Sequence, residues 1–339
     1  MNQRVNQRIV LKRRPVGEPT LADFELVESP APALGDGEIL CRTLYLSLDP
    51  YMRGRMNDVR SYAPSVELGQ VMVGGTVSEV VESRDPAFRP GDIVGNYGGW
   101  QAYSVAKAAG GGLFAVRKLD PKAAPISTAL GVLGMPGMTA YVGLLDIGRP
   151  KAGETVVVSA AAGAVGSIVG QIAKLKGCRA VGVAGSDDKC AHVVKDLGFD
   201  ACVNYKSADL FGALKAACPK GIDVYFDNVG GDVLKAVLRL VNPFARIPIC
   251  GAISQYNATE MPPGPNWAAI LVNRLLVQGF IISDHAARMG DFLAEVGGWV
   301  REGKIRYRED VVEGLAKAPE AFIGLLRGRN TGKMLVKVG

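Results

Sequence analysis

One glycine-rich segment has the residue types and spacing of a turn that binds nucleotide phosphates. The apolar run Thr155–Ser159 leads into Ala161-x-Gly163-x-x-Gly166, and a helical pattern follows directly. Gly163 lets the backbone approach a pyrophosphate, and Gly166 lets a helix pack closely on a strand. The helix N-terminus offers unpaired N–H groups to the phosphates. Although alanine replaces the first glycine, strand, turn, helix and next strand occur in the required order, so the segment predicts a dinucleotide site.

The residues after the second strand of this region indicate which dinucleotide would bind. An NAD site usually has an acidic residue at the tip of that strand, but here the tip carries none. Ser186, Lys189 and Tyr205 could instead offer a cation and hydroxyl donors to a 2′-phosphate. Asp187 and Asp188 argue against this unless they begin the next helix, where acidic residues are favoured. We therefore expect NADP(H) rather than NAD(H).

Composition limits the other functions that the chain could have. The 39 basic and 33 acidic residues leave a net charge of +6, and the absence of a basic run argues against nucleic acid as a partner. The longest apolar stretch is too short and too rich in small residues to span a membrane. The first residues lack the apolar core of a signal peptide, and the six cysteines form no C-x-x-C pair. We expect a cytoplasmic protein with reduced thiols.

The predicted elements divide the 339 residues into a β-rich part and an α/β part. Residues 37–45 and 71–81 are strand-like, a turn at 89–94 feeds another strand, and no long helix is expected before Pro125. Strands then alternate with helices, which is typical of a doubly wound parallel sheet. The predicted strands are 155–159, 180–183, 201–204, 224–226, 246–250 and 277–282, and the predicted helices are 167–176, 188–197, 210–218 and 233–241. The tail from about residue 305 is expected to be strand-like and to return to the first domain.

Several stretches of the chain resemble the zinc-independent medium-chain dehydrogenase/reductases. The similarity is greatest to the leukotriene hydroxydehydrogenase/prostaglandin reductase branch, which includes alkenal double-bond reductases and curcumin reductase. It covers nearly the whole chain and includes Asp49-Pro50-Tyr51-Met52 within residues 46–56. The other matching stretches are 134–141, 160–176, 185–189, 226–231 and 250–257.

This resemblance implies a fold, an assembly and a set of cofactor contacts. A GroES-like β-rich catalytic domain would comprise residues 1–127 and 304–339, and a Rossmann NADP-binding domain residues 128–303. A homodimer is usual in the family, with the active site in the interdomain cleft. Carried over by position, the cofactor contacts are Gly163, Ala164, Val165, Gly166, Lys189, Tyr205, Asn228, Cys250, Gly251, Ala252, Ile253, Ser254, Tyr256, Phe280, Ile281, Ile282 and Asn330.

The zinc-dependent relatives are a natural alternative, but their ligand pattern does not occur here. They need a cysteine in the early loop and a Gly-His-Glu segment later, because catalytic zinc takes three protein ligands. This chain has Asp49-Pro50-Tyr51 in the early loop and Gly69-Gln70-Val71 in the later segment, and its first histidine is His192. We therefore expect no metal. His192 and His285 are expected to be structural, and no nucleophile-elbow pattern occurs.

The lack of an obvious catalytic acid, base or nucleophile agrees with the chemistry that the resemblance implies, reduction of an α,β-unsaturated ketone or aldehyde by NADPH. Hydride transfer to the β-carbon places negative charge on the carbonyl oxygen, which needs hydrogen-bond donors, and solvent can protonate the α-carbon. Neutral tyrosines can donate, and Tyr256 and Tyr51 are the candidates, facing one cleft from opposite sides. Alternatively, Tyr51 packs on the cleft wall and Tyr256 only contacts the cofactor, whose ribose hydroxyl could share the role.

Other functions remain open at this point. Quinone reduction would use the same cofactor, as would oxidation of a secondary alcohol, and a non-catalytic NADPH-binding protein of the crystallin kind is a rival of another class. Retention of Tyr51 and Tyr256 favours an enzyme, because binding alone requires neither. Residues 56–65 and 261–267 include Tyr62, Met261 and Trp267, which favours a small apolar enone or alkenal as substrate.

Overall fold

The computed structural model describes residues 4–107, 112, 113 and 115–339, and it divides into two compact units. The first unit comprises the N-terminal part up to Gly134 together with Glu309–Gly339, and the second unit is Met135–Arg308. The sequence placed these boundaries at residues 127 and 303. The first boundary falls later because Leu130 packs with Val77 and Leu335 in a small core of the first unit.

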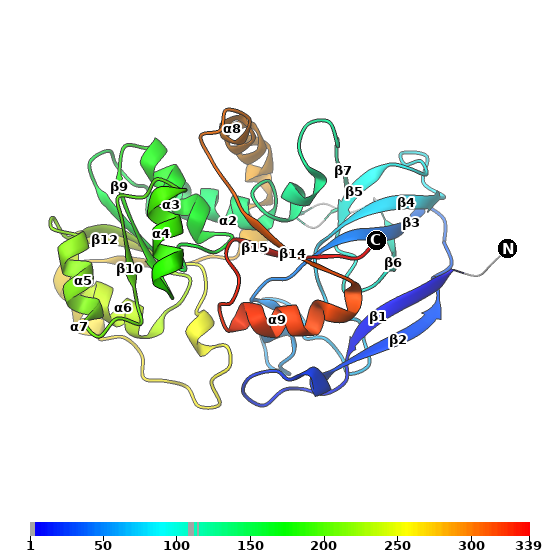
Figure 1. Cartoon of the computed structure of the whole chain (residues 1–339), viewed down its shortest axis with the longest axis horizontal. Helices are drawn as coiled ribbons and strands as arrows, with labels where there is room; N and C mark the ends of the chain where they lie inside the picture. The colour runs from blue at the N-terminus through cyan, green and yellow to red at the C-terminus, as the bar shows by residue number, and fades with distance from the viewer. Residues whose placement is uncertain (1–3, 108–111, 114) are drawn as a thin grey trace. The chain divides into compact units, whose positions relative to one another are not determined.

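The first unit contains two sheets. Strands β1 (Val5–Leu11) and β2 (Phe24–Pro30) form an antiparallel pair (Figure 1). The larger sheet has the order β14-β15-β3-β4-β5-β7, with β6 paired to β3. Its strands are β3 (Glu38–Ser47), β4 (Thr76–Ser83), β5 (Ile93–Asn96), β6 (Tyr103–Lys107), β7 (Arg117–Lys118), β14 (Glu309–Glu313) and β15 (Lys333–Lys337). β15 runs antiparallel to β3, so the C-terminal segment completes a sheet begun by the N-terminal segment, as predicted.

Helices occupy a small part of the first unit, and one of its strands is shorter than predicted. Before Pro125 the described residues contain only short helices, α1 (Met52–Arg55) and the 3-10 turn η1 (Leu21–Asp23). A second 3-10 turn, η2, follows at Ile126–Leu130. The strand expected at 71–81 begins only at Thr76, since the segment with Gly74 and Gly75 forms just a bridge from Val71 to Val10.

The expectation of a strand-like tail is wrong between β14 and β15. The 3-10 turn η6 (Leu315–Lys317) and helix α9 (Ala318–Leu326) lie there. Phe322 is fully buried, and its ring meets Trp100 edge-on with centroids 5.6 Å apart. Trp100 also stacks on Phe24 at 5.7 Å. This aromatic core, contributed by distant segments, decides that the tail forms a helix.

The second unit is a doubly wound α/β domain, as predicted. Six parallel strands follow the order β10-β9-β8-β11-β12-β13. They are β8 (Thr155–Ser159), β9 (Arg179–Ala184), β10 (Ala201–Asn204), β11 (Ile222–Phe226), β12 (Val241–Ile249) and β13 (Leu276–Gly279). The helices are α2 (Met135–Val142), α3 (Gly166–Leu175), α4 (Asp187–Lys195), α5 (Leu210–Ala217), α6 (Gly231–Leu238), α7 (Trp267–Asn273) and α8 (Met289–Arg301), and the short helical segments are η3 (Gly143–Gly148), η4 (Ile253–Gln255) and η5 (Ile282–Arg288).

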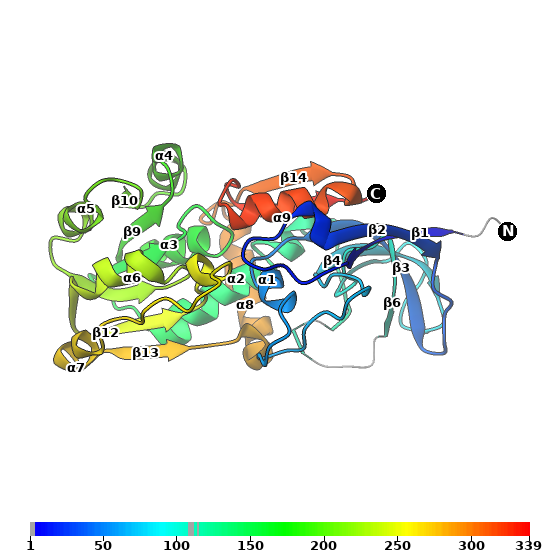
Figure 2. The ribbon, with the colours of Figure 1, turned by 90° about the horizontal axis from the view of Figure 1, so that it is seen from below.

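Two boundaries in the second unit differ from the prediction. The helix expected at 233–241 ends at Leu238, and Val241 already begins β12, where it is buried. The last strand stops at Gly279, because η5 begins at Ile282. β13 is the outer strand beside β12 (Figure 2).

Two further expectations concern the chain as a whole. All six cysteines carry free thiols, in agreement with the spacing argument. Within the described part of the chain, no helix has the length and apolar character needed to cross a membrane.

Candidate functional site

The predicted phosphate turn lies between β8 and α3, and its backbone leaves no space for larger residues. Ala160 adopts a left-handed conformation with φ of 51°, and the Gly163 N–H donates to the Ala160 carbonyl at 2.9 Å. A Cβ atom at Gly166 would lie 2.3 Å from that same carbonyl oxygen. Glycine is therefore required where α3 begins, and the first turn of α3 stays close to the end of β8.

The three residues expected to bind a 2′-phosphate come from the ends of two adjacent strands. Ser186 caps α4, and its hydroxyl accepts from the Lys189 N–H at 3.3 Å. The ring of Tyr205 lies over Gly185, where a Cβ would be 3.1 Å from its Cε1. Ser186 and Lys189 thus lie in the first turn of α4, and Tyr205 directly follows β10.

The two acidic residues that argued against NADP have structural positions. Asp187 and Asp188 form the first turn of α4, where the helix dipole favours negative charge. The Asp187 carboxylate also accepts from the side chain of Asn204 at 2.9 Å, which ties α4 to the end of β10. Both acidic residues thus have roles within the protein, as the first turn of α4 and, for Asp187, as the acceptor for Asn204.

A buried carboxylate organises the loop after β11. One oxygen of Asp227 accepts from the Tyr225 hydroxyl at 2.8 Å and from the N–H groups of Val229 and Gly230 at 2.9 and 2.8 Å. The Asn228 side chain, a predicted cofactor contact, donates to the Ser159 carbonyl at 2.8 Å. The loop after β11 is thereby fixed against the end of β8.

The loop after β12 is hydrogen-bonded to the loop after β11. The Cys250 N–H donates to the Asp227 carbonyl at 2.8 Å, and the Ser254 hydroxyl donates to the Val229 carbonyl at 2.6 Å. Burial, assisted by the Asp227 charge, raises the pKa of Cys250 to about 12, so its thiol stays protonated. Predicted cofactor contacts Gly251, Ala252 and Ile253 lie within this loop.

Tyr256 closes this loop by folding its side chain back over it. Its hydroxyl accepts from the Ala252 N–H at 3.4 Å. A Cβ at Gly251 would lie 2.8 Å from the hydroxyl oxygen, so glycine at this position makes the arrangement possible. A hydroxyl that accepts one bond can still donate its own proton, which is the property that the predicted role requires.

The residues that follow β13 begin with an aromatic side chain, Phe280, that packs against two other rings. The Phe280 ring packs edge-on against Phe226 at 6.2 Å and against His285 at 6.3 Å. These contacts leave the Phe280 side chain half-buried. His192 pairs with Asp196 through Nδ1 at 2.6 Å, and both histidines thus have structural contacts.

These loops all leave the carboxyl ends of parallel strands, which meet at one edge of the sheet. The strand order reverses between β8 and β11, and dinucleotides bind at such a switch point in doubly wound folds. Hydrogen bonds and side-chain contacts bring together the loops after β8, β11 and β12, and those after β9 and β10. The residues fit an NADP-type nucleotide. The turn at Gly163–Gly166 allows the backbone to approach a pyrophosphate, and Lys189 with the hydroxyls of Ser186 and Tyr205 fits a 2′-phosphate.

Two predicted site residues belong to the first unit. The Tyr51 hydroxyl lies 2.9 Å from the Tyr97 hydroxyl, and burial raises the pKa of Tyr51 well above its usual value. Arg55 lies 5.9 Å from the Tyr51 ring and 5.0 Å from the Tyr62 ring. Asn330 is buried and donates through its side chain to the Gly332 carbonyl at 2.8 Å, which shapes the turn before β15.

Comparison with known proteins relates this geometry to a family. A family described as "N-terminal domain of oxidoreductase" matches residues 7–116, and one described as "Zinc-binding dehydrogenase" matches residues 164–296. The chain is 54% identical to the NADPH-dependent curcumin reductase of Escherichia coli, over 98% of this chain and 97% of the relative. It belongs to the medium-chain dehydrogenase/reductases. Its branch is that of the curcumin and prostaglandin reductases, since prostaglandin reductase 1 of Rattus norvegicus is 48% identical over 96% and 97% of the two chains.

A solved structure supports the assignment of this chain to the medium-chain reductases. The crystal structure of CurA from Vibrio vulnificus in complex with NADPH has a TM-score of 0.94 and 51% identity, covering 98% of this chain and 99% of that one. This agreement covers both units of the medium-chain fold. The predicted fold class, a GroES-like β-rich domain with a Rossmann domain, is confirmed.

The zinc-binding relatives within the family need a cluster of ligands. Across the parts of this reductase that the structure describes, no three His, Cys, Asp or Glu side chains come together as a metal site. Asp49, which stands in the loop where those relatives carry cysteine, instead pairs with Lys333 at 2.9 Å.

Three residues that hold the predicted site residues in place were not predicted from the sequence. Asp227 lay within the matching stretch 226–231, and a buried acid beside glycines was a usable signal for a loop-organising carboxylate. Tyr97 and Lys333 gave no such signal, because each acquires its partner from a segment far along the chain.

Proposed function

We propose that this medium-chain reductase reduces the carbon–carbon double bond of α,β-unsaturated ketones and aldehydes, with NADPH as its cofactor. Two features together support the proposal. The loops at the carboxyl ends of the parallel strands fit an NADP-type nucleotide, and tyrosine hydroxyls are the candidate hydrogen-bond donors to the substrate. A curcumin reductase and a prostaglandin reductase 1 are relatives at 54% and 48% identity. One solved relative holds NADPH.

The chain's own residues account for cofactor binding. The α3 N-terminus and the backbone at Gly163–Gly166 would receive the pyrophosphate, because a turn this close to β8 exposes N–H groups. Lys189, with the hydroxyls of Ser186 and Tyr205, would hold the 2′-phosphate. The remainder of the cofactor would be contacted by Asn228, the loop at 250–254, residues 280–282 and Asn330. When bound, NADPH supplies the hydride for the β-carbon.

The protein's part in the chemical step is to orient the enone and to stabilise charge on its oxygen. Tyr256 and Tyr51 are the proposed donors to the carbonyl oxygen. Burial raises the pKa of Tyr51, so this hydroxyl keeps its proton at neutral pH. A neutral donor held in position strengthens its hydrogen bond as enolate charge develops, which lowers the barrier to hydride transfer. Solvent then protonates the α-carbon.

We also propose that the reductase is a homodimer formed through β13, the outer strand of the Rossmann sheet. All four residues of β13 are exposed, and Leu271 and Val272 at the end of α7 are 79% and 67% exposed. An exposed strand edge beside apolar side chains is a ready surface for pairing with a second copy. Val277→Glu should give monomers in light scattering, and a wild-type chain that is monomeric at micromolar concentration would refute the dimer. The cytoplasmic location stays a prediction.

One experiment tests the reaction. The reductase is mixed with NADPH and, in separate assays, a 2-alkenal, an aryl enone and a quinone, and NADPH loss is followed by absorbance. Deuterium carried on the transferring position of NADPH should appear at the β-carbon of a saturated ketone or aldehyde, as shown by NMR.

Other products would favour the rivals. A hydroquinone with no saturated ketone would favour a quinone reductase. An allylic alcohol would place the hydride on the carbonyl carbon and contradict the proposal. Tight NADPH binding without oxidation by any acceptor would favour a non-catalytic NADPH-binding protein.

A further inference from the structure

Tyr51 shares a hydrogen bond with a second tyrosine from a different segment of the first unit. The hydroxyl oxygens of Tyr51 and Tyr97 are 2.9 Å apart, and either hydroxyl can be the donor. Tyr51 precedes α1, whereas Tyr97 directly follows β5. The contact therefore depends on how two loops of one unit are held.

The Tyr97 loop is fixed by a buried polar network and by two glycines. The Asn96 side-chain oxygen accepts from the Thr76 hydroxyl at 2.6 Å and from the Ser78 hydroxyl at 3.0 Å. A Cβ at Gly98 would lie 2.8 Å from the Thr76 hydroxyl oxygen, and one at Gly99, where φ is 75°, would lie 2.8 Å from a backbone carbonyl. The chain on both sides of Tyr97 therefore has little freedom.

The Tyr51 loop is fixed from the other end of the sequence. Lys333 on β15 donates to the Leu48 carbonyl at 2.6 Å and to Asp49 at 2.9 Å, two residues before Tyr51. The ionisable groups that face Tyr51 are Asp49, Arg55, Tyr62 and Tyr97. Burial raises the pKa of both Tyr51 and Tyr97, so each hydroxyl carries its proton at neutral pH.

We propose that Tyr97 is a positioning residue of the reaction: its hydrogen bond with Tyr51 holds the Tyr51 hydroxyl in place, and when Tyr51 donates to the substrate oxygen, Tyr97 donates to Tyr51. A hydroxyl that accepts one hydrogen bond becomes a stronger donor of the next, because the chain of bonds polarises each member. While no substrate is bound, either hydroxyl can be the donor. The inference rests on the proposed role of Tyr51 in enone reduction.

A double-mutant cycle separates this role from simple packing. Tyr51→Phe should lower kcat on an enone by about 10–100-fold, and Tyr97→Phe by about 5–10-fold, with KM and the NADPH Kd nearly unchanged. Because Tyr97 acts only through Tyr51, the double variant should be no slower than Tyr51→Phe alone. Tyr45→Phe, which removes another half-buried tyrosine hydroxyl of the same unit, should leave kcat unchanged.

The hydrogen bond between the two hydroxyls can be tested without any turnover. 3-Fluorotyrosine at position 51 lowers the phenol pKa, and its titration is followed by ¹⁹F NMR. An ionised Tyr51 can only accept, so a Tyr97 hydroxyl held beside it donates and stabilises the phenolate, and Tyr97→Phe should raise that pKa. An unchanged or lowered pKa would show that Tyr97 does not donate to Tyr51 and would overturn the proposal.

The two readouts distinguish failure of this inference from failure of the proposed function. Independent kcat losses that multiply in the double variant would overturn the positioning role, as would an unchanged kcat in Tyr97→Phe. If the wild-type protein reduces only quinones, the same cycle is measured with the quinone, and the fluorotyrosine titration still tests whether Tyr97 donates to Tyr51. If no acceptor is reduced, the enone reaction fails while the titration tests the hydroxyl pair by itself.

Discussion

Lys333 and Asp49 form a buried ion pair that joins the last strand of the chain to the loop carrying Tyr51. Their charged atoms are 2.9 Å apart, and only 4% and 7% of the two side chains is exposed. The Lys333 ammonium also donates to the carbonyls of Leu48 and Met334. The Ser47 hydroxyl donates to the other oxygen of Asp49. Both charges are thus fully partnered, which is the condition under which a buried pair is tolerated.

Removing one partner of this pair should destabilise the first unit strongly. Lys333→Met leaves the Asp49 carboxylate buried without its cation, and we expect a loss of about 3–5 kcal/mol in the free energy of unfolding, measured by urea titration. Lys337→Met, on the same strand, removes an exposed pair with Glu313 and should cost under about 1 kcal/mol. Similar losses for the two variants would contradict the importance assigned to the buried pair.

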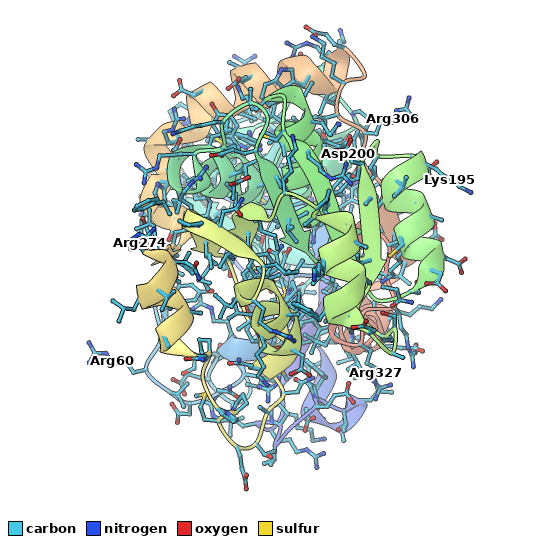
Figure 3. All side chains as sticks on the ribbon, turned by 90° about the vertical axis from the view of Figure 1, so that its left-hand side faces the viewer. Arg60, Lys195, Asp200, Arg274, Arg306 and Arg327 are labelled. Carbon is cyan, nitrogen blue, oxygen red and sulfur yellow. The ribbon has the colours of Figure 1, made fainter. Side chains whose placement is uncertain are left out.

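The assignment of the 2′-phosphate site predicts a selective loss of affinity. Lys189→Ala should raise the Kd for NADPH by about 10–100-fold, because a charge-assisted contact to phosphate is lost, and should leave the Kd for NADH nearly unchanged. Isothermal calorimetry with both nucleotides measures this. Lys195, which extends outward from the end of α4 (Figure 3), provides the matched control, and Lys195→Ala should alter neither Kd. An equal loss for both nucleotides would refute the assignment.

The hydroxyl of Tyr256 is expected to act in turnover and not in binding. Tyr256→Phe should lower kcat on an enone by about 10–100-fold while the NADPH Kd stays nearly constant. Gly251→Ala should have a similar effect, since its Cβ would lie 2.8 Å from that hydroxyl and displace it. Tyr141→Phe removes a donor to Glu295 in the same unit and should change stability but not kcat. Full turnover in Tyr256→Phe would remove this residue from the catalytic set.

The close approach of α3 to β8 gives a steric prediction. Gly166→Ala places a methyl group 2.3 Å from the Ala160 carbonyl oxygen, so the phosphate turn must shift. We expect a loss of about 1–3 kcal/mol in stability and at least about 10-fold weaker NADPH binding. Gly290→Ala, in a helix with open space around the site, should be neutral or slightly stabilising. Unchanged NADPH binding in Gly166→Ala would show that the turn can adapt.

Asp200 makes the second unit sensitive to acid. Burial alone would raise the pKa of Asp200, but hydrogen bonds from Lys174 at 2.8 Å and the Ala180 N–H at 2.7 Å outweigh it, and the pKa lies below its usual value (Figure 3 shows its position). A carboxyl with a lowered folded-state pKa contributes stability above its unfolded pKa of about 3.9, and this is lost as the pH falls through the folded value.

The measurement is the unfolding of Asp200→Asn as a function of pH. At pH 7 we expect a loss of about 1–2 kcal/mol relative to wild type, and the difference should shrink below about pH 4. Asp232→Asn removes a carboxylate from an exposed pair with Lys235 and should show almost no difference at either pH. A loss in Asp200→Asn that is constant from pH 7 to pH 3 would contradict the linkage.

Local features of the second unit could be predicted from the sequence. The strand at Thr155–Ser159, the turn at Gly163–Gly166 and the beginning of α4 at Asp187 each depend on neighbouring residues. Alternation of strands and helices implies a parallel sheet, and the carboxyl ends of its strands meet at one edge. Ser186, Lys189 and Tyr205 were therefore predicted as NADP-type residues from their positions after these strands.

Elements whose structure is decided by distant packing could not be predicted from the sequence. Residues 318–326 contain apolar side chains that suit a strand as well as a helix, and they form α9 because Phe322 packs against Trp100. Val241 fitted a helical pattern but entered the sheet, where β12 pairs with β11 and β13. Short apolar runs do not distinguish the two outcomes until their neighbours are known.

The sequence by itself determined a nucleotide-binding Rossmann unit, its preference for NADP and the lack of a zinc-ligand pattern. Only the tertiary structure decided that Tyr51 is bonded to Tyr97 and that Asp49 is paired with Lys333, 284 residues away. Backbone turns and helix starts are specified by adjacent residues, whose conformations and hydrogen bonds are local. A contact between side chains far apart in the chain is specified only when both segments are placed by the packing of the whole unit.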